Sequence, residues 1–392
     1  MSGSVGRLHG LAVTLAASGQ TWRTEQAPAA LDGLKVHDSF ELPPSTVEPE
    51  FQQTTDVPVP TTRATPGNIP GPEVPIPITP YYRAAGTAAS PLEELLFACL
   101  AAATTATQQG VTPAYLHTMT EASTHAMLRE PPTRFFTVAD KLPLDSNQIY
   151  RSVPSALVNG FELESSADGV KLTVKLRGNK VSLDSSTISA AWSNLTYADQ
   201  SKLLKHHHAN NLIWLAKSAA VGGSPVTFGS GQAVHPSKVK IAFDWGLEDV
   251  HTDAQDTDLP DSQQTPKITV GLEFPKVLAA NRTLLEDNFA AYANDTDALF
   301  HFLIRWKYPV AINTTYYPYM EMGFPALLLT KCDGLKVAPG KFVPHSMEFQ
   351  AGEPTAVSHL PTVFPYCGGA AGTSKDAMYL AIMGTNTAAI IA

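Results

Sequence analysis

The stretch Gly169–Gly178 (GVKLTVKLRG) alternates between aliphatic and polar side chains along its whole length. Successive side chains of a β-strand point to opposite faces of a sheet, so this pattern predicts a strand with one aliphatic and one basic face. Another strand candidate, LVNGFELES, precedes it across the turn pair Asp168-Gly169, which together predict a β-hairpin. The basic face carries Lys171, Lys175 and Arg177, which are able to meet nucleic acid, a neighbouring subunit or water.

Five further segments are expected to be strands. KVKIAFDWGLED and PKITVGLEFPKV predict a second hairpin with a long connection near residues 248–266. ALFHFLIRWKY places Phe300, Phe302, Ile304 and Trp306 on one face, and FPALLLTKC and FVPHSMEFQAG add two later strands. This order lacks the regular βαβ alternation of a doubly wound sheet, so the expected fold is a mainly β sandwich or barrel with flanking α-helices.

The first clear helix signal begins at Ser90. Ser90 is a capping residue, Pro91 suits the first helical position, and Glu93 completes a capping box. The helix is expected to run through LEELLFACLAAATTATQQ and to close at Gly110. Residues 183–220, including ISAAWSNL and NLIWLAKSAA, are interpreted as a helical insertion, and RTLLEDNFAAYAND as a later helix.

Residues 1–89 are expected to form a long extended arm that includes a candidate first strand. The segment VEPEFQQTTDVPVPTTRATPGNIPGPEVPIPITPYY is rich in proline, which excludes a helix or a central strand. It also carries many apolar side chains, which favours an arm lying on a surface, a neighbour's included, over a flexible linker. The predicted organisation is therefore an arm over 1–89 and a β-domain over 90–392. GLAVTLAASG, near the start, is a poor signal peptide because its apolar run is short and interrupted.

Composition narrows the classes of function. A formal charge of −9 argues against a general nucleic-acid binder, which would carry a basic domain or stripe. The three cysteines are far apart and show no C-x-x-C spacing, which fits a reducing compartment. No window of the sequence is apolar over about 18 residues, so no membrane span is expected.

Candidate sites for chemistry are weak. His206, His207 and His208 are consecutive, whereas paired zinc histidines on a helix are separated by three or four positions, so a solvated or interface cluster is favoured over a metal site. No G-x-S-x-G elbow, P-loop or dinucleotide fingerprint occurs. The sequence therefore predicts no enzyme, no catalytic residue, no metal and no cofactor.

The long connection EDVHTDAQDTDLPD contains six acids and no Lys or Arg. It lacks the glycine turn and the final Glu of a calcium loop, so a solvated or partner-docking loop is favoured. The acids of this candidate docking loop are Glu248, Asp249, Asp253, Asp256, Asp258 and Asp261.

Taken in order, these segments resemble the major tail tube proteins of tailed bacteriophages. The resemblance covers roughly residues 5–390 and is carried by GRLHGLAV, SPLEELLFACLAAA, the hairpin YRSVPSALVNGFELESSADGVKLTVKLRG, the second hairpin, RTLLEDNFAAY, FHFLIRW and HSMEFQAG. The family's "G-x-x-V-N-S-L" strand is matched loosely by Ala156, Leu157, Val158, Asn159 and Gly160. The insertion at 183–220 and the length of the Pro-rich arm depart from the family's compact pattern.

The resemblance implies a small β-barrel or sandwich whose subunits form rings, commonly six-membered. Hairpins of adjacent subunits would join into an inner barrel, and loops or arms would stack the rings into a tube. It further implies a virion tail protein made in the bacterial cytoplasm, with tape-measure, tail terminator and distal tail proteins as partners. DNA would pass through the lumen without specific binding, which suits a negatively charged protein.

Two other classes remain open from the sequence. One is a different β-rich assembly subunit, such as a secretion-tube subunit or another virion component. The other is a secreted hydrolase or carbohydrate-binding protein. Under the tail-tube interpretation, Lys171, Lys175 and Arg177 are expected to face outward or to meet acids of a neighbour, because cations in a lumen would grip phosphate.

Overall fold

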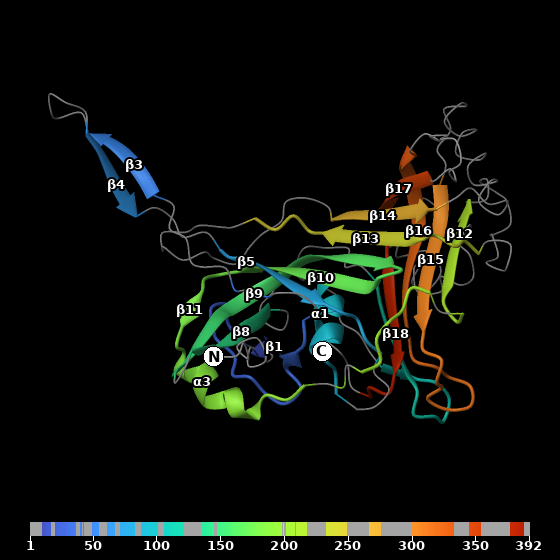
Figure 1. Ribbon diagram of the computed structural model, residues 1–392, viewed down its shortest axis with the longest axis horizontal. Coiled ribbons are helices and arrows are strands. Elements are labelled where there is room, and N and C mark those ends of the chain that lie inside the picture. Colours follow the sequence, from blue (N-terminus) through green and yellow to red (C-terminus); the bar gives the residue numbers. More distant parts are fainter. Residues whose placement is uncertain are drawn as a thin grey trace, which may run out of the picture.

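The fold is known from a computed structural model of the chain, whose ribbon is drawn in Figure 1. It describes residues 10–16, 20–36, 40, 42, 49–54, 61–66, 71–82, 88–100, 106–120, 135–144, 147–197, 199, 201–207, 209–217, 233–248, 266–275, 299–332, 345–353 and 377–387.

The described part of the chain is mainly β. Its strands are β1 Gly10–Leu15, β2 Gly33–Leu34, β3 Pro49–Thr54, β4 Thr61–Pro66, β5 Glu73–Ile78, β6 Ala106–Gln108, β7 Tyr115–Thr120, β8 Phe135–Leu144, β9 Asn147–Ser166, β10 Gly169–Gly178, β11 Ser182–Leu183, β12 Leu212–Lys217, β13 Lys238–Asp244, β14 Lys267–Phe274, β15 Leu299–Lys307, β16 Tyr319–Cys332, β17 His345–Gly352 and β18 Tyr379–Gly384. Its helices are α1 Pro91–Leu100, α3 Ser186–Ala191 and the 3₁₀ turn η2 Trp192–Asn194.

Sixteen of these strands form one antiparallel sheet, and β3 and β4 form a separate two-stranded hairpin. Both hairpins expected from the sequence are confirmed, because β9 pairs with β10 and β13 pairs with β14. The two hairpins lie side by side, since β13 also pairs with β9. The result is the continuous order β5-β10-β9-β13-β14-β17-β16.

Two long strands turn the sheet into a two-layered shape. The first half of β9 pairs with β8 and its second half with β13, on the same edge, while β10 occupies the other edge. In the same way, the first half of β16 pairs with β18 and its second half with β17 along one edge, while β15 pairs along the opposite edge. In Figure 1, β9, β10, β13 and β14 accordingly run across the top, and β15, β16 and β18 descend steeply on one side.

A β-bulge at Asn159 lets β9 change partners. The register with β10 shifts there, so that Lys175 is opposite Gly160 and Leu176 is opposite Val158. The bulged residue is not left unpaired: its carbonyl accepts the N–H of Trp245 at 2.8 Å, and its side-chain oxygen accepts the N–H of Leu247 at 2.9 Å. The chain leaving β13 is thereby fixed to β9.

One hydrophobic core lies between the two parts of the sheet and encloses α1. The core-facing side chains of β10 (Val170, Leu172, Val174 and Leu176) are 0–1% exposed, and nine of the ten residues of α1 are buried. The Ser90 N–H donates to the Glu93 carboxylate at 2.8 Å, as the capping box predicted. At the other end of α1, the indole N–H of Trp245 donates to the Cys99 carbonyl at 2.6 Å, which satisfies one of the free carbonyls of a helix terminus.

Parts of the N-terminal region, which was expected to be an extended arm lying on a surface, belong to the chain's own sheet. Gly10–Leu15, inside the weak signal-peptide candidate, is the buried strand β1 and pairs with β8. The proline-rich segment contributes β5, which pairs with β10. Proline was expected to exclude a central strand, and β5 is indeed paired with a strand on one side alone apart from a single bridge at Ile78. The β3–β4 hairpin stands away from the body in Figure 1.

The predicted helical insertion over 183–220 is wrong in its second half. ISAAWSNL does contain helix, as α3 and η2, but NLIWLAKSAA contains strand β12, paired with β15. In β12, Leu215 faces the main core, whereas Ala216 and Trp214 pack in a smaller cluster on the other face. The six residues of β12 fit the period of a helix as well as that of a strand, and pairing with the buried β15 makes them a strand.

The helix beginning at Pro91 is also shorter than predicted. Residues 106–108 form β6, which pairs with β7, so the helix does not extend to Gly110. The helix predicted over RTLLEDNFAAYAND lies outside the described residues.

Glycine at position 160 is a requirement of the β9–β13 pairing. A Cβ there would collide with the backbone oxygen of Phe243, whereas a Cβ at Gly271, in the neighbouring β14, would meet Lys240 Cβ at an ordinary 3.6 Å. We therefore expect Gly160→Ala to lower the free energy of unfolding by about 1–3 kcal/mol. The matched control Gly271→Ala should change it by no more than about 0.5 kcal/mol. Urea denaturation followed by circular dichroism measures both, and equal effects would contradict the close approach.

Candidate functional surface

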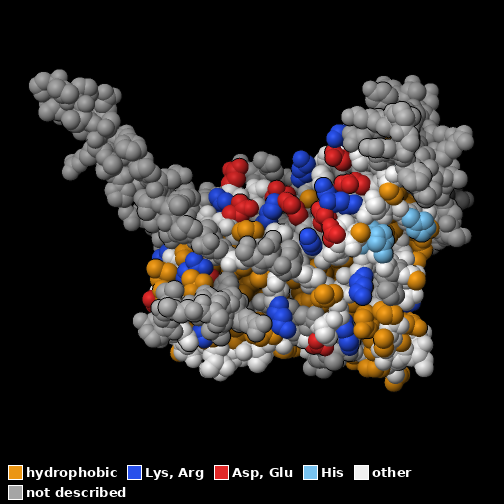
Figure 2. Space-filling model, in the orientation of Figure 1, with side chains coloured by type: hydrophobic (Ala, Val, Ile, Leu, Met, Phe, Trp, Pro, Cys, Tyr) orange, Lys and Arg blue, Asp and Glu red, His pale blue; other side chains and the backbone are white. Residues whose placement is uncertain are grey.

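The face of the β10-β9-β13-β14-β17 sheet that points away from the core is covered with charged side chains of both signs. Figure 2 shows them gathered over these strands along the top of the molecule. We call this surface the charged face. Its cations are Lys171, Lys175, Arg177, Lys238, Lys240, Lys267 and Lys331, and its acids are Glu73, Glu162, Glu164, Asp244, Glu273 and Glu348. The seven cations and six acids give it a net charge of +1.

The signs of the charges change from one strand to the next, whereas β10 alone carries only cations on this face and the outward acids of β9 are both glutamates. The pairing registers place side chains from six neighbouring strands in one row. In order, this row is Lys171, Glu164, Lys240, Gly271, Glu348 and Lys331. Opposite charges on facing strands attract one another, so the row stabilises the pairing register and leaves no large area of one sign.

Ion pairs join neighbouring strands within the charged face. Lys175 Nζ lies 2.5 Å from Glu162 Oε1, and Lys238 Nζ lies 2.7 Å from Glu164 Oε1. Two looser pairs join Lys240 to Glu273 at 3.8 Å and Lys331 to Glu348 at 3.9 Å. All of these side chains are partly exposed, so each pair contributes at most about 1 kcal/mol to stability. Their main effect is therefore on the potential of the surface rather than on the fold.

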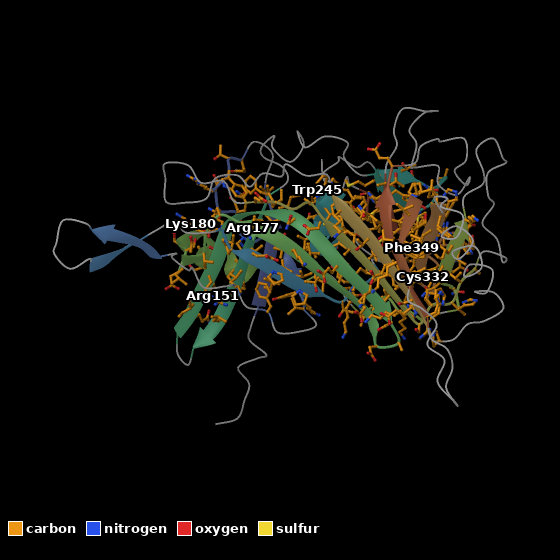
Figure 3. All side chains as sticks on the ribbon, turned by 90° about the horizontal axis from the view of Figure 1, so that it is seen from above. Arg151, Arg177, Lys180, Trp245, Cys332 and Phe349 are labelled. Carbon is orange, nitrogen blue, oxygen red and sulfur yellow. The ribbon has the colours of Figure 1, made fainter. Side chains whose placement is uncertain are left out.

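An open trough of about 750 Å³ crosses the middle of the charged face. Its lining includes Ala242, which has only a methyl side chain, and Gly271, which has none, among long lysines and glutamates. Lys171 and Lys240 are among the cations that line it, and Glu164 is among the acids. Seen from above in Figure 3, the strands of this face run side by side, with Arg177 near one end and Phe349 and Cys332 near the other.

The three cations singled out in the sequence lie on the charged face, on the side of β10 opposite its buried aliphatic residues. Lys175 is bound by Glu162 of its own chain, and that hydrogen bond raises the pKa of the lysine. Lys171 is exposed, and Arg177 is opposite Glu73 of β5. Acids of the same chain thus accompany these cations, and contact with a neighbour's acids stays a prediction.

The sequence analysis did not identify Glu162 and Glu164 as the acids that lie beside Lys171 and Lys175. The signal was present in the hairpin itself. A tight turn at Ala167-Asp168 fixes Lys171 opposite Glu164 and Thr173 opposite Glu162, as the structure has them. Counting residues outward from the turn therefore predicts acids beside the lysines.

Of the candidate docking loop, Glu248 alone lies within the described residues, where it is exposed. Asp249, Asp253, Asp256, Asp258 and Asp261 lie outside them, so their docking role stays a prediction. The two ends of the connection are placed, at Leu247 beside Asn159 and at Lys267 in β14. The loop therefore leaves and re-enters the sheet at one end of the charged face.

The histidine cluster has a structural explanation at its first member. His206 is 6% exposed, and its Nε2 donates to the Pro236 carbonyl at 3.0 Å. Its Nδ1 therefore accepts the hydroxyl of Ser165 at 2.7 Å, and Ser165 also accepts the indole N–H of Trp306 at 3.3 Å. Ser165 is 0% exposed, so this Ser–His pair cannot reach a substrate and instead ties the segment around His206 to β9.

His206 was expected in a solvated or interface cluster, and its burial differs from that expectation. His207 is exposed and packs its ring against that of His206, with ring centroids 4.5 Å apart, while His208 lies outside the described residues. Among the residues that the structure describes, no three metal-binding side chains come together. In the same part of the chain, no helix has the length and apolar character needed to cross a membrane.

Comparison of the sequence with protein-family models and with curated proteins finds no match.

The balance of charge on this face leads to a prediction about DNA. Glu162→Gln with Glu164→Gln would raise the net charge of the charged face from +1 to +3 and release Lys175 and Lys238 from their partners. We expect the double variant to bind duplex DNA measurably more tightly than the parent, with an affinity that falls as salt rises. Fluorescence anisotropy over a salt series measures this. The control Glu353→Gln removes an exposed acid beyond the end of β17 and should leave DNA binding unchanged.

Three buried histidines predict that the fold loses stability at acidic pH. Burial lowers the pKa of His117, His206 and His345 below the usual 6.5, and among the described residues neither ring nitrogen of His345 has a hydrogen-bond partner. The folded state then binds fewer protons than the unfolded state, so the stability is fully present above about pH 6.5 and is lost as pH falls through the folded-state pKa values. Urea unfolding at pH 7.5 and at pH 5.5 should show the loss, and His345→Gln should reduce its slope. Equal stability at both pH values would exclude this origin.

Proposed function

We propose that this chain is a structural subunit of a tube, of the kind formed by the major tail tube proteins of tailed bacteriophages. The observation that carries the proposal is the wall made by the two adjacent hairpins. Four neighbouring strands, β10, β9, β13 and β14, turn one side to a deep core and the other to solvent as a broad charged face. A subunit that lines or clads a channel needs a surface of this form.

The electrostatics of the charged face also support a conducting tube. Phosphate binding by a protein grows with the number of cations that are free to meet it. Here Lys175 and Lys238 are already bound by glutamates, and acids and lysines alternate along the row through Glu164. Such a surface neither attracts a polyanion strongly nor repels it strongly, whichever side of the wall it forms.

Two features of the described residues that could suggest an enzyme are better explained otherwise. The Ser165–His206 pair is buried and fully hydrogen-bonded, and the trough on the charged face is open and lined in part by charged side chains of both signs. Substrate pockets are usually concave and largely apolar, with a few polar groups that converge. The trough differs from such a pocket because it is open to solvent and charged side chains of both signs, among them Glu162, Lys240 and Glu348, line it.

In this proposal the protein acts in the virion tail, after synthesis in the bacterial cytoplasm. Its partners are further copies of itself, together with tape-measure, tail terminator and distal tail proteins. DNA passes along the tube without specific binding. No catalytic group, metal or cofactor has a part in it.

Electron microscopy of the purified protein tests the proposal. Rings or tubes about 100 Å across are expected, an estimate for six subunits of ordinary domain size. A protein that stays monomeric at high concentration and in crowding agents would overturn it. Filaments or cages of another form would instead favour a different β-rich assembly protein.

The docking role of the long connection is tested separately. Deletion of residues 252–262 should leave β13 paired with β14 and the subunit folded, but should prevent rings from stacking. Replacing Asp253, Asp256 and Asp258 by Asn keeps the length of the loop and isolates the effect of charge. Circular dichroism checks the fold, and microscopy counts tubes against single rings. Tubes of normal length from the deletion variant would refute the docking role.

A further inference from the structure

The strand β5 ends the order of the charged sheet on one side. It pairs with β10 over its whole length, from Glu73 opposite Arg177 to Ile78 opposite Leu172. Its side chains alternate strictly: Val74, Ile76 and Ile78 are 0% exposed and lie in the core. A flat edge strand with free backbone groups would be a template for a strand of another copy.

A hydrogen bond just outside β5 shows which of its backbone groups face β10. The N–H of Gly178 donates to the carbonyl of Pro72 at 2.9 Å. Backbone groups alternate in direction along a strand, so the even-numbered residues of β5, in step with Pro72, point their N–H and C=O groups toward β10. The odd-numbered residues, Glu73, Pro75 and Pro77, point theirs to the outer edge.

Proline has no N–H, so two of the three outward positions of β5 cannot donate a hydrogen bond. The inner ladder loses nothing, because its donors are Val74, Ile76 and Ile78. Near the C-terminal end of the outer edge, Val36 forms a single bridge with Ile78. The outer edge is thus left with acceptors and almost no donors.

We propose that β5 is a proline-blocked edge that prevents another copy of this chain from extending the charged sheet by strand pairing. Copies that approach this edge must contact it through side chains, among them Glu73 and Arg177. The proposal does not depend on the tube assignment. If tubes do form, it excludes a barrel made continuous by backbone hydrogen bonds at β5.

Other edges of the described sheet are covered in different ways. The carbonyl of Ile213 in β12 accepts the N–H of Val234 at 2.9 Å, and the N–H of Gly33 in β2 donates to the Thr196 carbonyl at 2.9 Å. There, other segments of the same chain occupy the edge. At β5, positions 75 and 77 have no bridge partner in the described structure. There the missing N–H groups of the two prolines block the edge instead.

Restoring the donors tests the proposal. Pro75→Thr with Pro77→Thr introduces β-branched side chains, which suit a strand, and supplies two N–H groups at the edge. In sedimentation velocity over a concentration series, we expect the variant to associate with a several-fold larger assembled fraction than the parent at equal concentration. Hydrogen exchange should show the new amides of residues 75 and 77 protected in the assembled fraction and exchanging freely in the monomer.

Three controls make the outcome decisive. Pro309→Thr, in the exposed turn after β15, makes the same exchange away from the edge and should match the parent. Pro75→Lys with Pro77→Lys restores the donors but adds charge, and should associate less than the threonine variant. Single Pro75→Thr serves if the double variant unfolds. A folded threonine variant of the same size as the parent would overturn the proposal. Absence of tubes in the parent would count against the proposed function alone.

Discussion

The backbone hydrogen bonding of β9 is the constraint on which the rest of the structure depends. This strand of 20 residues lies inside the sheet, so its N–H and C=O groups must find partners on both edges. A straight strand of that length would need equally long neighbours. The bulge at Asn159 removes the need, because it allows β8 to serve the first half of one edge and β13 the second half. The two layers around the core follow from this change of partner.

The same bulge also connects the sheet to α1. Asn159 binds the backbone of Trp245 and Leu247, and the Trp245 ring in turn donates to the last turn of α1 at Cys99. A single deviation from regular pairing therefore orients β9, the exit of β13 and the C-terminal end of the helix. Gly160 is needed next to it because the Phe243 backbone approaches so closely. These constraints fall on residues 156–160 and on the strand that crosses them.

Local patterns in the sequence predicted the elements whose period was unambiguous. The alternation in Gly169–Gly178 and the turn before it were sufficient for the β9–β10 hairpin, and the capping box at Ser90 predicted the start of α1. The prediction of a helix over NLIWLAKSAA was wrong because six residues between two polar ends fit a helix as well as a strand. Pairing with β15, more than eighty residues later, makes this segment a strand. The hydrogen bonds of His206 to Ser165 and Pro236 were not predicted, for a related reason. They join segments that only the folded sheet brings together.

The charged face shows how pairing register turns a sequence pattern into a surface property. Considered alone, β10 offers three cations, and a strand with that face suits phosphate binding. Register with β9 places Glu164 opposite Lys171, and the neighbouring strand places Lys240 on the other side of the same acid. The carboxylates are therefore shared between strands, and no strand presents its charge independently. Glu164 stands between Lys171 and Lys240, and Glu348 stands beside Lys331. A polyanion that approaches this row therefore meets repulsion close to attraction, at spacings shorter than the Debye length of about 8 Å in physiological salt. A polyanion would therefore experience the average of this row, close to neutral, rather than the basic stripe that β10 suggests by itself.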